Sequence, residues 1–79
     1  MDKNQIKPNM IVEAIFYKYG TTIVQGKVNE VLSVPGMKNG KFVDDLPLVS
    51  ISVQKIVEGD ETYLGYTIGV DPEDVIKEV

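Results

Sequence analysis

Two-residue alternation is clearest in one stretch of the sequence, Leu48-Val49-Ser50-Ile51-Ser52-Val53-Gln54-Lys55-Ile56-Val57. Apolar side chains at every second position predict a β-strand that turns one face toward a core. The expected inner face holds Val49, Ile51, Val53 and Val57, with Lys55 breaking the row near its end. The stretch therefore indicates a β domain.

The same period of two continues on both sides of this strand. Residues 11–19 predict a strand with Val12 and Ala14 on one face, and residues 22–34 predict another whose phase changes near Asn29-Glu30. A change of phase predicts a β-bulge, and Gly26 in the same run predicts a close approach of two backbones. Residues 63–70 predict a returning strand with Tyr66 inward and Tyr63 outward.

Turn signals separate these runs. Pro8-Asn9 predicts a turn before the first strand, because asparagine tolerates left-handed backbone geometry. Residues 35–47 interrupt the alternation and predict a variable loop. Within it, Asn39-Gly40 predicts a tight hairpin that brings Met37 near Phe42.

The C-terminal residues begin with a helix-start signal, Asp71-Pro72-Glu73-Asp74. Aspartate is a good cap and proline suits the first helical position, but too few residues follow for a full helix. We therefore expect a single 3-10 turn and a short closing strand at 75–79.

This turn and the lead-in Ile6-Lys7-Pro8-Asn9-Met10-Ile11-Val12 together resemble the SH3-like small β-barrel, as seen in SH3, Tudor and KOW-type modules. The resemblance implies a mainly β fold of five to six strands, with the 3-10 turn before the last one, in a single domain over residues 1–79. No tryptophan is present, so the peptide groove of eukaryotic SH3 domains is not carried over. An OB-fold barrel is the competing architecture, but residues 58–61 are too short for its helix.

The chain contains no histidine and no cysteine. The usual general base, the thiol nucleophile and the commonest metal ligands are therefore missing. Two groups of acids, Asp44-Asp45 and those at 58–61, do not have the spacing of a calcium loop. We expect no enzymatic activity, no cofactor and no metal site.

Charge is unevenly distributed along the chain. All 8 basic residues are lysines against 12 acids, and residues 1–57 carry +2 whereas residues 58–79 carry −6. Without the planar arginine fork, sequence-specific reading of DNA is less expected. The acidic segment predicts either a solvated face, or a surface that engages a basic protein or mimics nucleic acid toward it.

Candidate binding residues are the aromatic and basic side chains that alternation leaves outside the core. They are Tyr17, Tyr19, Phe42, Tyr63, Lys38 and Lys41. Exposed tyrosines anchor protein partners or stack on bases. We expect a non-catalytic protein-interaction module, a stand-alone bacterial or phage accessory protein with a protein partner.

The alternative is a small barrel that binds RNA or single-stranded DNA through its tyrosines and lysines. The lysines concerned are Lys18, Lys27, Lys38 and Lys41. No stretch approaches the roughly 20 apolar residues of a membrane span, and no signal peptide is recognisable, so we expect a cytoplasmic protein without a membrane partner. Because the core is small, we also expect a homodimer through the edge of the strand at 48–57.

Overall fold

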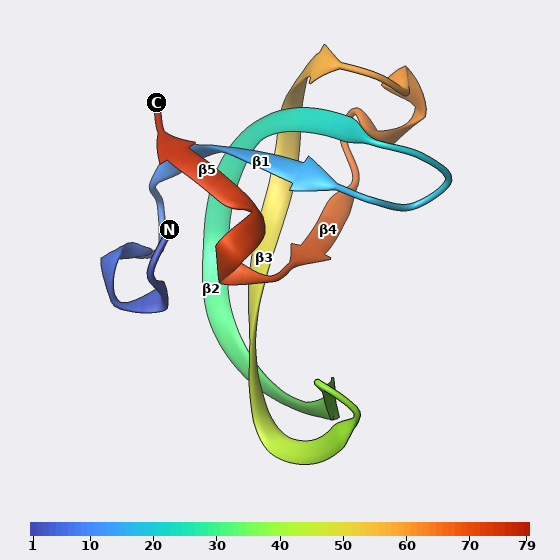
Figure 1. The fold of residues 1–79 in the computed structure, drawn as a ribbon. Coiled ribbons are helices and arrows are strands. Elements are labelled where there is room, and N and C mark those ends of the chain that lie inside the picture. Colours follow the sequence, from blue (N-terminus) through green and yellow to red (C-terminus); the bar gives the residue numbers. More distant parts are fainter.

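The computed structural model describes residues 1–79 and contains one sheet of five antiparallel strands in the order β4-β3-β2-β1-β5 (Figure 1). The strands are β1 (Ile11–Phe16), β2 (Thr22–Lys38), β3 (Lys41–Glu58), β4 (Thr67–Val70) and β5 (Val75–Glu78). The 3-10 turns are η1 (Lys3–Gln5), η2 (Glu61–Tyr63) and η3 (Pro72–Asp74). The predicted mainly β class is confirmed. No helical segment has the length and apolar character needed to cross a membrane.

The inner face of the sheet carries the core. Val49, Ile51 and Val53 are buried as the alternation predicts, and Val12 and Ala14 meet them from β1. The other buried apolar residues of the cluster are Ile6, Val24, Val28, Ile68, Val70 and Val75. The sheet is curved enough that β1 also contacts β4, although the two are not neighbours in strand order.

Register shifts change which side chains face the core. The pairing shifts between Val28 and Glu30, where the sequence predicts a bulge. A second shift, between Gln25 and Gly26, changes the phase of β3 near its end. Ile56 therefore packs against the core, and the predicted inward position of Val57 is wrong.

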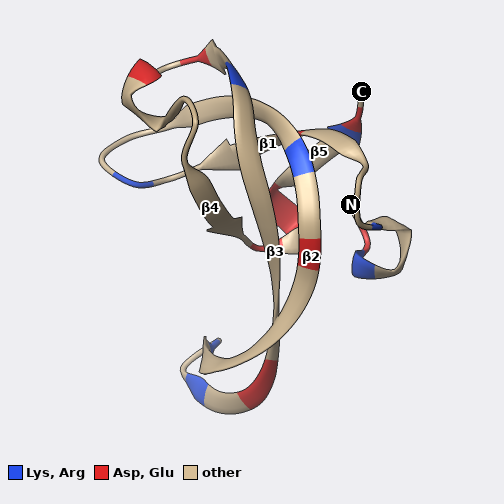
Figure 2. Cartoon of the chain, turned by 180° about the vertical axis from the view of Figure 1, so that it is seen from behind, with Lys and Arg blue, Asp and Glu red and all other residues tan.

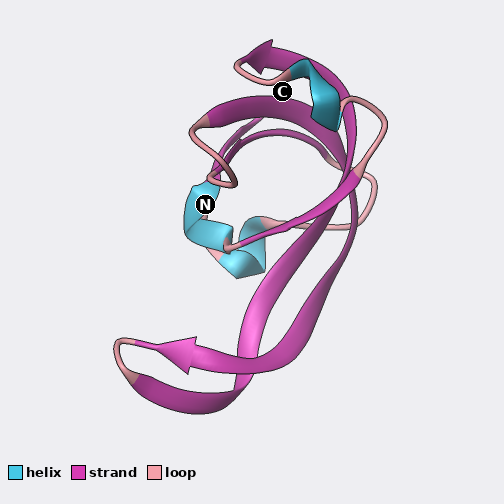
Figure 3. Cartoon of the chain, turned by 90° about the vertical axis from the view of Figure 1, so that its right-hand side faces the viewer, coloured by secondary structure: helices cyan, strands magenta, loops and turns pink.

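Beyond the core, β2 and β3 continue as a two-stranded ribbon, which we call the arm (residues 31–48) (Figures 1 and 3). Asn39 and Gly40 close it with φ angles of 53° and 76°, and Met37 pairs with Phe42 as predicted. The predicted variable loop at 35–47 is wrong, because both strands stay paired up to this turn.

The N-terminus of the chain contacts η3. The carboxylate of Asp71 accepts a hydrogen bond from the Glu73 amide at 2.9 Å and caps the turn, and β5 follows, as the sequence predicts. The Met1 ammonium group donates to the carbonyl oxygens of Pro72 at 2.9 Å and Val75 at 2.6 Å. The first residue is thereby fixed against the last turn.

The predicted strand at 63–70 is correct only from Thr67 onward. Asp60 accepts a hydrogen bond from the Thr62 amide at 2.8 Å, which starts the 3-10 turn η2 instead of a strand. Because of this turn, the exposure of the two tyrosines is opposite to the prediction: Tyr63 is 7% exposed and Tyr66 is 54% exposed. The predicted open edge at 48–57 is also covered in part, because β4 pairs with β3 from Val49 to Ser52.

Candidate functional site

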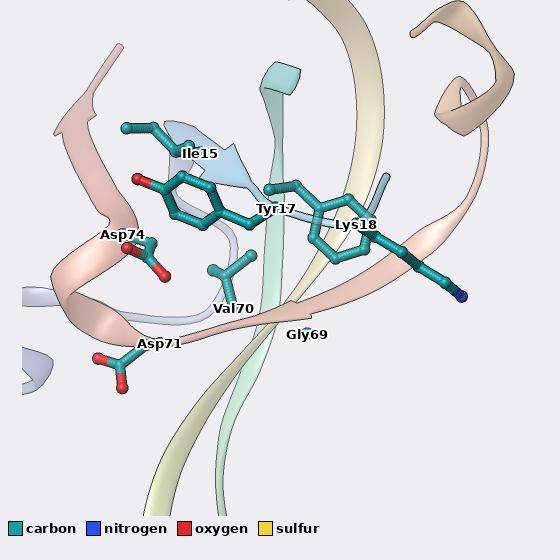
Figure 4. A pocket seen from close by; sticks show the side chains of 8 residues that line it. Ile15, Tyr17, Lys18, Gly69, Val70, Asp71 and Asp74 are labelled. Carbon is teal, nitrogen blue, oxygen red and sulfur yellow. The ribbon is translucent and has the colours of Figure 1, made fainter. Parts of the chain in front are cut away.

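A shallow cavity of about 290 Å³ lies between the end of β1 and the η3 turn (Figure 4). Its lining residues come from β1 and the loop after it, and from β4 and η3. They are Ile15, Phe16, Tyr17, Lys18, Gly69, Val70, Asp71 and Asp74. Half of these lining residues are hydrophobic, so the cavity offers both apolar and polar contacts.

Tyr17 provides the aromatic side of the cavity. The strand β1 ends at Phe16, so Tyr17 stands in the β1–β2 loop, which turns through Tyr19 and Gly20 with φ angles of 57° and 108°. Its side chain is exposed. In Figure 4 the ring extends across the cavity toward the side that holds Asp74.

Two carboxylates form the opposite side. Asp71 caps η3 and Asp74 ends it, so both are positioned by the same short turn. Burial raises the pKa of Asp74, and the neighbouring Asp71 and Glu73 carboxylates raise it further, while the N-terminal ammonium group lowers it. The Lys18 amino group points away from both carboxylates (Figure 4). The side of the cavity formed by Asp71 and Asp74 therefore carries negative charge that Lys18 does not neutralise.

Tyr63 is buried beneath the β1–β2 loop and supports it. Its hydroxyl donates to the Lys18 carbonyl oxygen at 3.2 Å, and its ring packs edge-on against Phe16 at 5.0 Å between centroids. Burial, and then the charge of Asp60, raise its pKa. The expectation that Tyr63 faces outward is wrong, and its side chain presents no free surface to a partner.

Tyr19 is the most exposed aromatic side chain, at 93%. The Lys18 ammonium lies 5.7 Å from the centroid of its ring, within the range of a cation–π interaction. Tyr17 and Tyr19 therefore present two aromatic rings on the β1–β2 loop.

The remaining candidates lie at the tip of the arm, remote in sequence and in the fold from the cavity (Figure 1). Lys38 and Lys41 face each other across the turn, and Phe42 follows with 65% of its surface exposed. The candidate residues thus fall into two surfaces. Sequence reasoning missed Asp71 and Asp74 as cavity residues, because their helix-start pattern explained them fully as a cap.

The lysine positions are scattered along the ribbon (Figure 2). Lys27 lies on β2 outside the arm, and Lys18 lies in the β1–β2 loop. Lys38 and Lys41 occupy the arm tip. A strand of nucleic acid is bound by a connected basic groove. These four lysines therefore do not supply a connected basic groove.

Comparison of the chain with protein-family models, with curated proteins and with solved structures finds no match. The structure brings together no group of three acidic side chains that could hold a metal ion. Function is therefore inferred from the surfaces of this chain alone.

Proposed function

We propose that this chain is a non-catalytic protein-interaction module that binds a basic segment of a partner protein at the cavity beside Tyr17. One observation carries the proposal: an exposed aromatic ring and two carboxylates, Asp71 and Asp74, border the same shallow cavity. Aromatic rings and carboxylates are the groups that attract a lysine or arginine side chain.

The shape of the cavity supports a protein ligand over a small molecule. Small-molecule pockets enclose most of the ligand surface within a deep, largely apolar concavity. This cavity is shallow, and Ile15 and Val70 are among its apolar lining residues. It suits the end of one long side chain whose backbone stays outside.

We further propose that the sheet closes as an SH3-like barrel. The order β4-β3-β2-β1-β5, the η3 turn immediately before β5, and the contact between β1 and β4 support this architecture. Nuclear Overhauser contacts between the two edge strands, β4 and β5, in solution would test it. Their absence would leave an open sheet.

The binding proposal is tested by capture of partners from a host lysate treated with nuclease, followed by calorimetric titration of the captured protein. We expect Tyr17→Ala and Asp74→Asn each to weaken binding at least tenfold, because each removes one side of the cavity. The matched control is Glu78→Gln, an exposed carboxylate on β5 outside the cavity. Equal binding by all three variants would refute the proposal.

A nucleic-acid ligand remains the second candidate, and the exposed Lys18–Tyr19 pair is the observation that favours it. A base could stack on the ring while the ammonium contacts a phosphate. The test is titration of a fluorescent single-stranded oligonucleotide at several salt concentrations. A steep fall in affinity with salt supports this candidate, because phosphate contacts release counterions.

A further inference from the structure

The strand β4 has an open edge beside the cavity. It lies at one end of the strand order and pairs only with β3. Two of its residues, Gly69 and Val70, line the cavity (Figure 4). Thr67 and Gly69 are exposed, and neither takes part in a backbone hydrogen bond outside the strand ladders.

Alternation along β4 determines which backbone groups face this open edge. The carbonyl oxygen of Tyr66 accepts a hydrogen bond from a β3 amide at 2.8 Å, in the register that β4 keeps with β3. In an antiparallel pair, every second residue turns both its N–H and its C=O toward the partner strand. Ile68 and Val70 therefore face β3, whereas Thr67 and Gly69 direct both groups to the open edge.

The other side of the cavity also lacks a strand partner on the side away from β2. β5 pairs with β1 from Val12 to Ala14, and the cavity residues 15–18 follow directly. β4 is paired with neither β1 nor β5. Closure of the proposed barrel would thus occur through side chains, and it would leave the backbone groups of the β4 edge free.

We propose that the basic segment bound at the cavity adds to the sheet as an extended strand on the open edge of β4. This binding mode rests on the proposed function of the cavity and adds the conformation of its ligand. Two residues of the segment exchange hydrogen bonds with Thr67 and Gly69. When a peptide joins an exposed sheet edge in this way, its backbone gives affinity and its alternate side chains give specificity.

The position of Val70 determines which ligand side chain enters the cavity. Side chains directly opposite each other on neighbouring strands share one face of the sheet. Val70 is buried and lines the cavity, so the ligand residue opposite it points toward Tyr17 and the carboxylates of Asp71 and Asp74 (Figure 4). A lysine or arginine at this ligand position is attracted by both kinds of group. The ligand residues on either side of it face outward.

Charge disfavours a second copy of this chain as the occupant of the edge. Residues 58–79, which include β4, carry −6, and Asp71, Glu73 and Asp74 follow β4 directly. Two β4 edges would bring these carboxylates together, and like charges on adjacent strands are destabilising. β4 is also only 4 residues long, and short edge strands avoid self-pairing. A basic segment of another protein neutralises the same charge.

The first experiment selects a peptide and then removes one N–H from the edge. The probe is a library of short random peptides with capped ends and a fixed central lysine or arginine. It is selected against the full chain, and the best binder is titrated by calorimetry. We expect Thr67→Pro to weaken its binding about tenfold or more, since this N–H faces away from β3. Thr67→Val keeps the N–H and is the matched control, which should bind as the natural chain does.

Proline is tolerated at the first residue of an edge strand, and thermal melts show whether Thr67→Pro is folded. Two further measurements need no variant. N-methylation of the peptide amides that face β4 should abolish binding, whereas methylation of the amides between them should not. Amide exchange at Thr67 and Gly69 should slow about tenfold or more in the complex, because both N–H groups become hydrogen-bonded.

Strand addition is overturned if no peptide of the library binds, or if a folded Thr67→Pro variant binds as Thr67→Val does. It is also overturned if N-methylation has no alternating effect, or if exchange at Thr67 and Gly69 is unchanged in the complex. A dimer of the free chain that Thr67→Pro dissociates would overturn it too, since a second copy would then occupy the edge.

These outcomes are distinct from failure of the proposed function. If Tyr17→Ala and Asp74→Asn weaken binding of the captured partner and Thr67→Pro does not, the cavity binds its ligand without strand addition. If only Thr67→Pro weakens binding of the peptide, strand addition to β4 holds and the proposed function of the cavity fails.

Discussion

The backbone at Gly26 lies directly against Ser52. A β-carbon at Gly26 would collide with the Ser52 carbonyl oxygen and lie 2.7 Å from Cγ2 of Ile51. The absence of a side chain lets β2 and β3 pass closely at the centre of the core face, where Val24, Val28 and Ile51 are fully buried. Gly26 is thus required by packing, since its φ is not in the left-handed region.

Replacing Gly26 with alanine should therefore be costly. We expect Gly26→Ala to lower the free energy of unfolding by about 1 to 3 kcal/mol, the range for an overfilled core. Gly36→Ala is the matched control: its β-carbon would approach only the side chain of Leu46, whose flexible end, Cδ1 at 2.6 Å, can move aside. Urea denaturation of both variants measures the difference. Equal losses would show that the close approach to Ser52 is not the cause.

Burial of Tyr63 under the β1–β2 loop predicts a strong effect on stability. We expect Tyr63→Ala to lower Tm by roughly 10 °C or more, because it removes a buried ring and leaves the Lys18 carbonyl without its donor. Tyr19→Ala should change Tm by no more than about 4 °C, since exposed positions contribute about 0.5 kcal/mol or less. Calorimetry of the two variants tests the contrast, and a larger effect at Tyr19 would contradict this structure.

Asp74 predicts a specific pH dependence. Burial and neighbouring carboxylates raise its pKa, so the folded chain holds this proton more tightly than the unfolded chain. Stability from this group is therefore present below the ordinary aspartate pKa of about 3.9, and it is lost as the pH rises through the raised pKa. We expect Asp74→Asn to raise Tm slightly at about pH 7 and to have no effect at about pH 3, where the aspartate is also neutral.

The control for that measurement is Glu78→Gln, which also removes one exposed carboxylate from the C-terminal segment. It should leave Tm unchanged at both pH values. A rise in Tm of the same size in both variants would mean that net charge, and not the position of Asp74, determines the effect.

The contact of the Met1 ammonium with η3 predicts sensitivity to N-terminal extension. An added residue converts the ammonium to an amide, which cannot donate to both Pro72 and Val75 carbonyl oxygens. We expect a Gly-Ser extension before Met1 to lower the free energy of unfolding by about 1.5 to 3 kcal/mol, the range for charged hydrogen bonds. The same extension after Val79 is the control. A similar loss of stability there would show that the contacts of the Met1 ammonium are not the cause.

Alternation predicted the parts of this fold that obey a simple period. Val49, Ile51 and Val53 are buried as predicted, because they lie on the face of β3 that packs into the core. Turn chemistry was equally informative at Asn39-Gly40, where the backbone takes positive φ. These signals are local, so they can be read from sequence.

The errors arose where a feature other than the period of two determines the structure. Tyr63 fits an outward strand position, yet the Asp60 cap turns it into a 3-10 turn and places its ring on Phe16. Proline at 35 and 47 suggested a loop, but a ribbon paired on one side only can accept proline on its open side. The cavity was not predictable, because it joins Tyr17 to Asp71 and Asp74 across distant parts of the chain.

The arm should unfold locally, independently of the rest of the sheet. Its hydrogen bonds join only β2 to β3, and no core residue lies beyond Val49 in that direction. Amide protons of the arm should therefore exchange with solvent through local fraying, while those of β1 and the centre of β3 exchange only when the whole chain unfolds. The outer part of the arm is therefore not needed for folding: a shorter hairpin could replace it, and the remaining sheet would still fold.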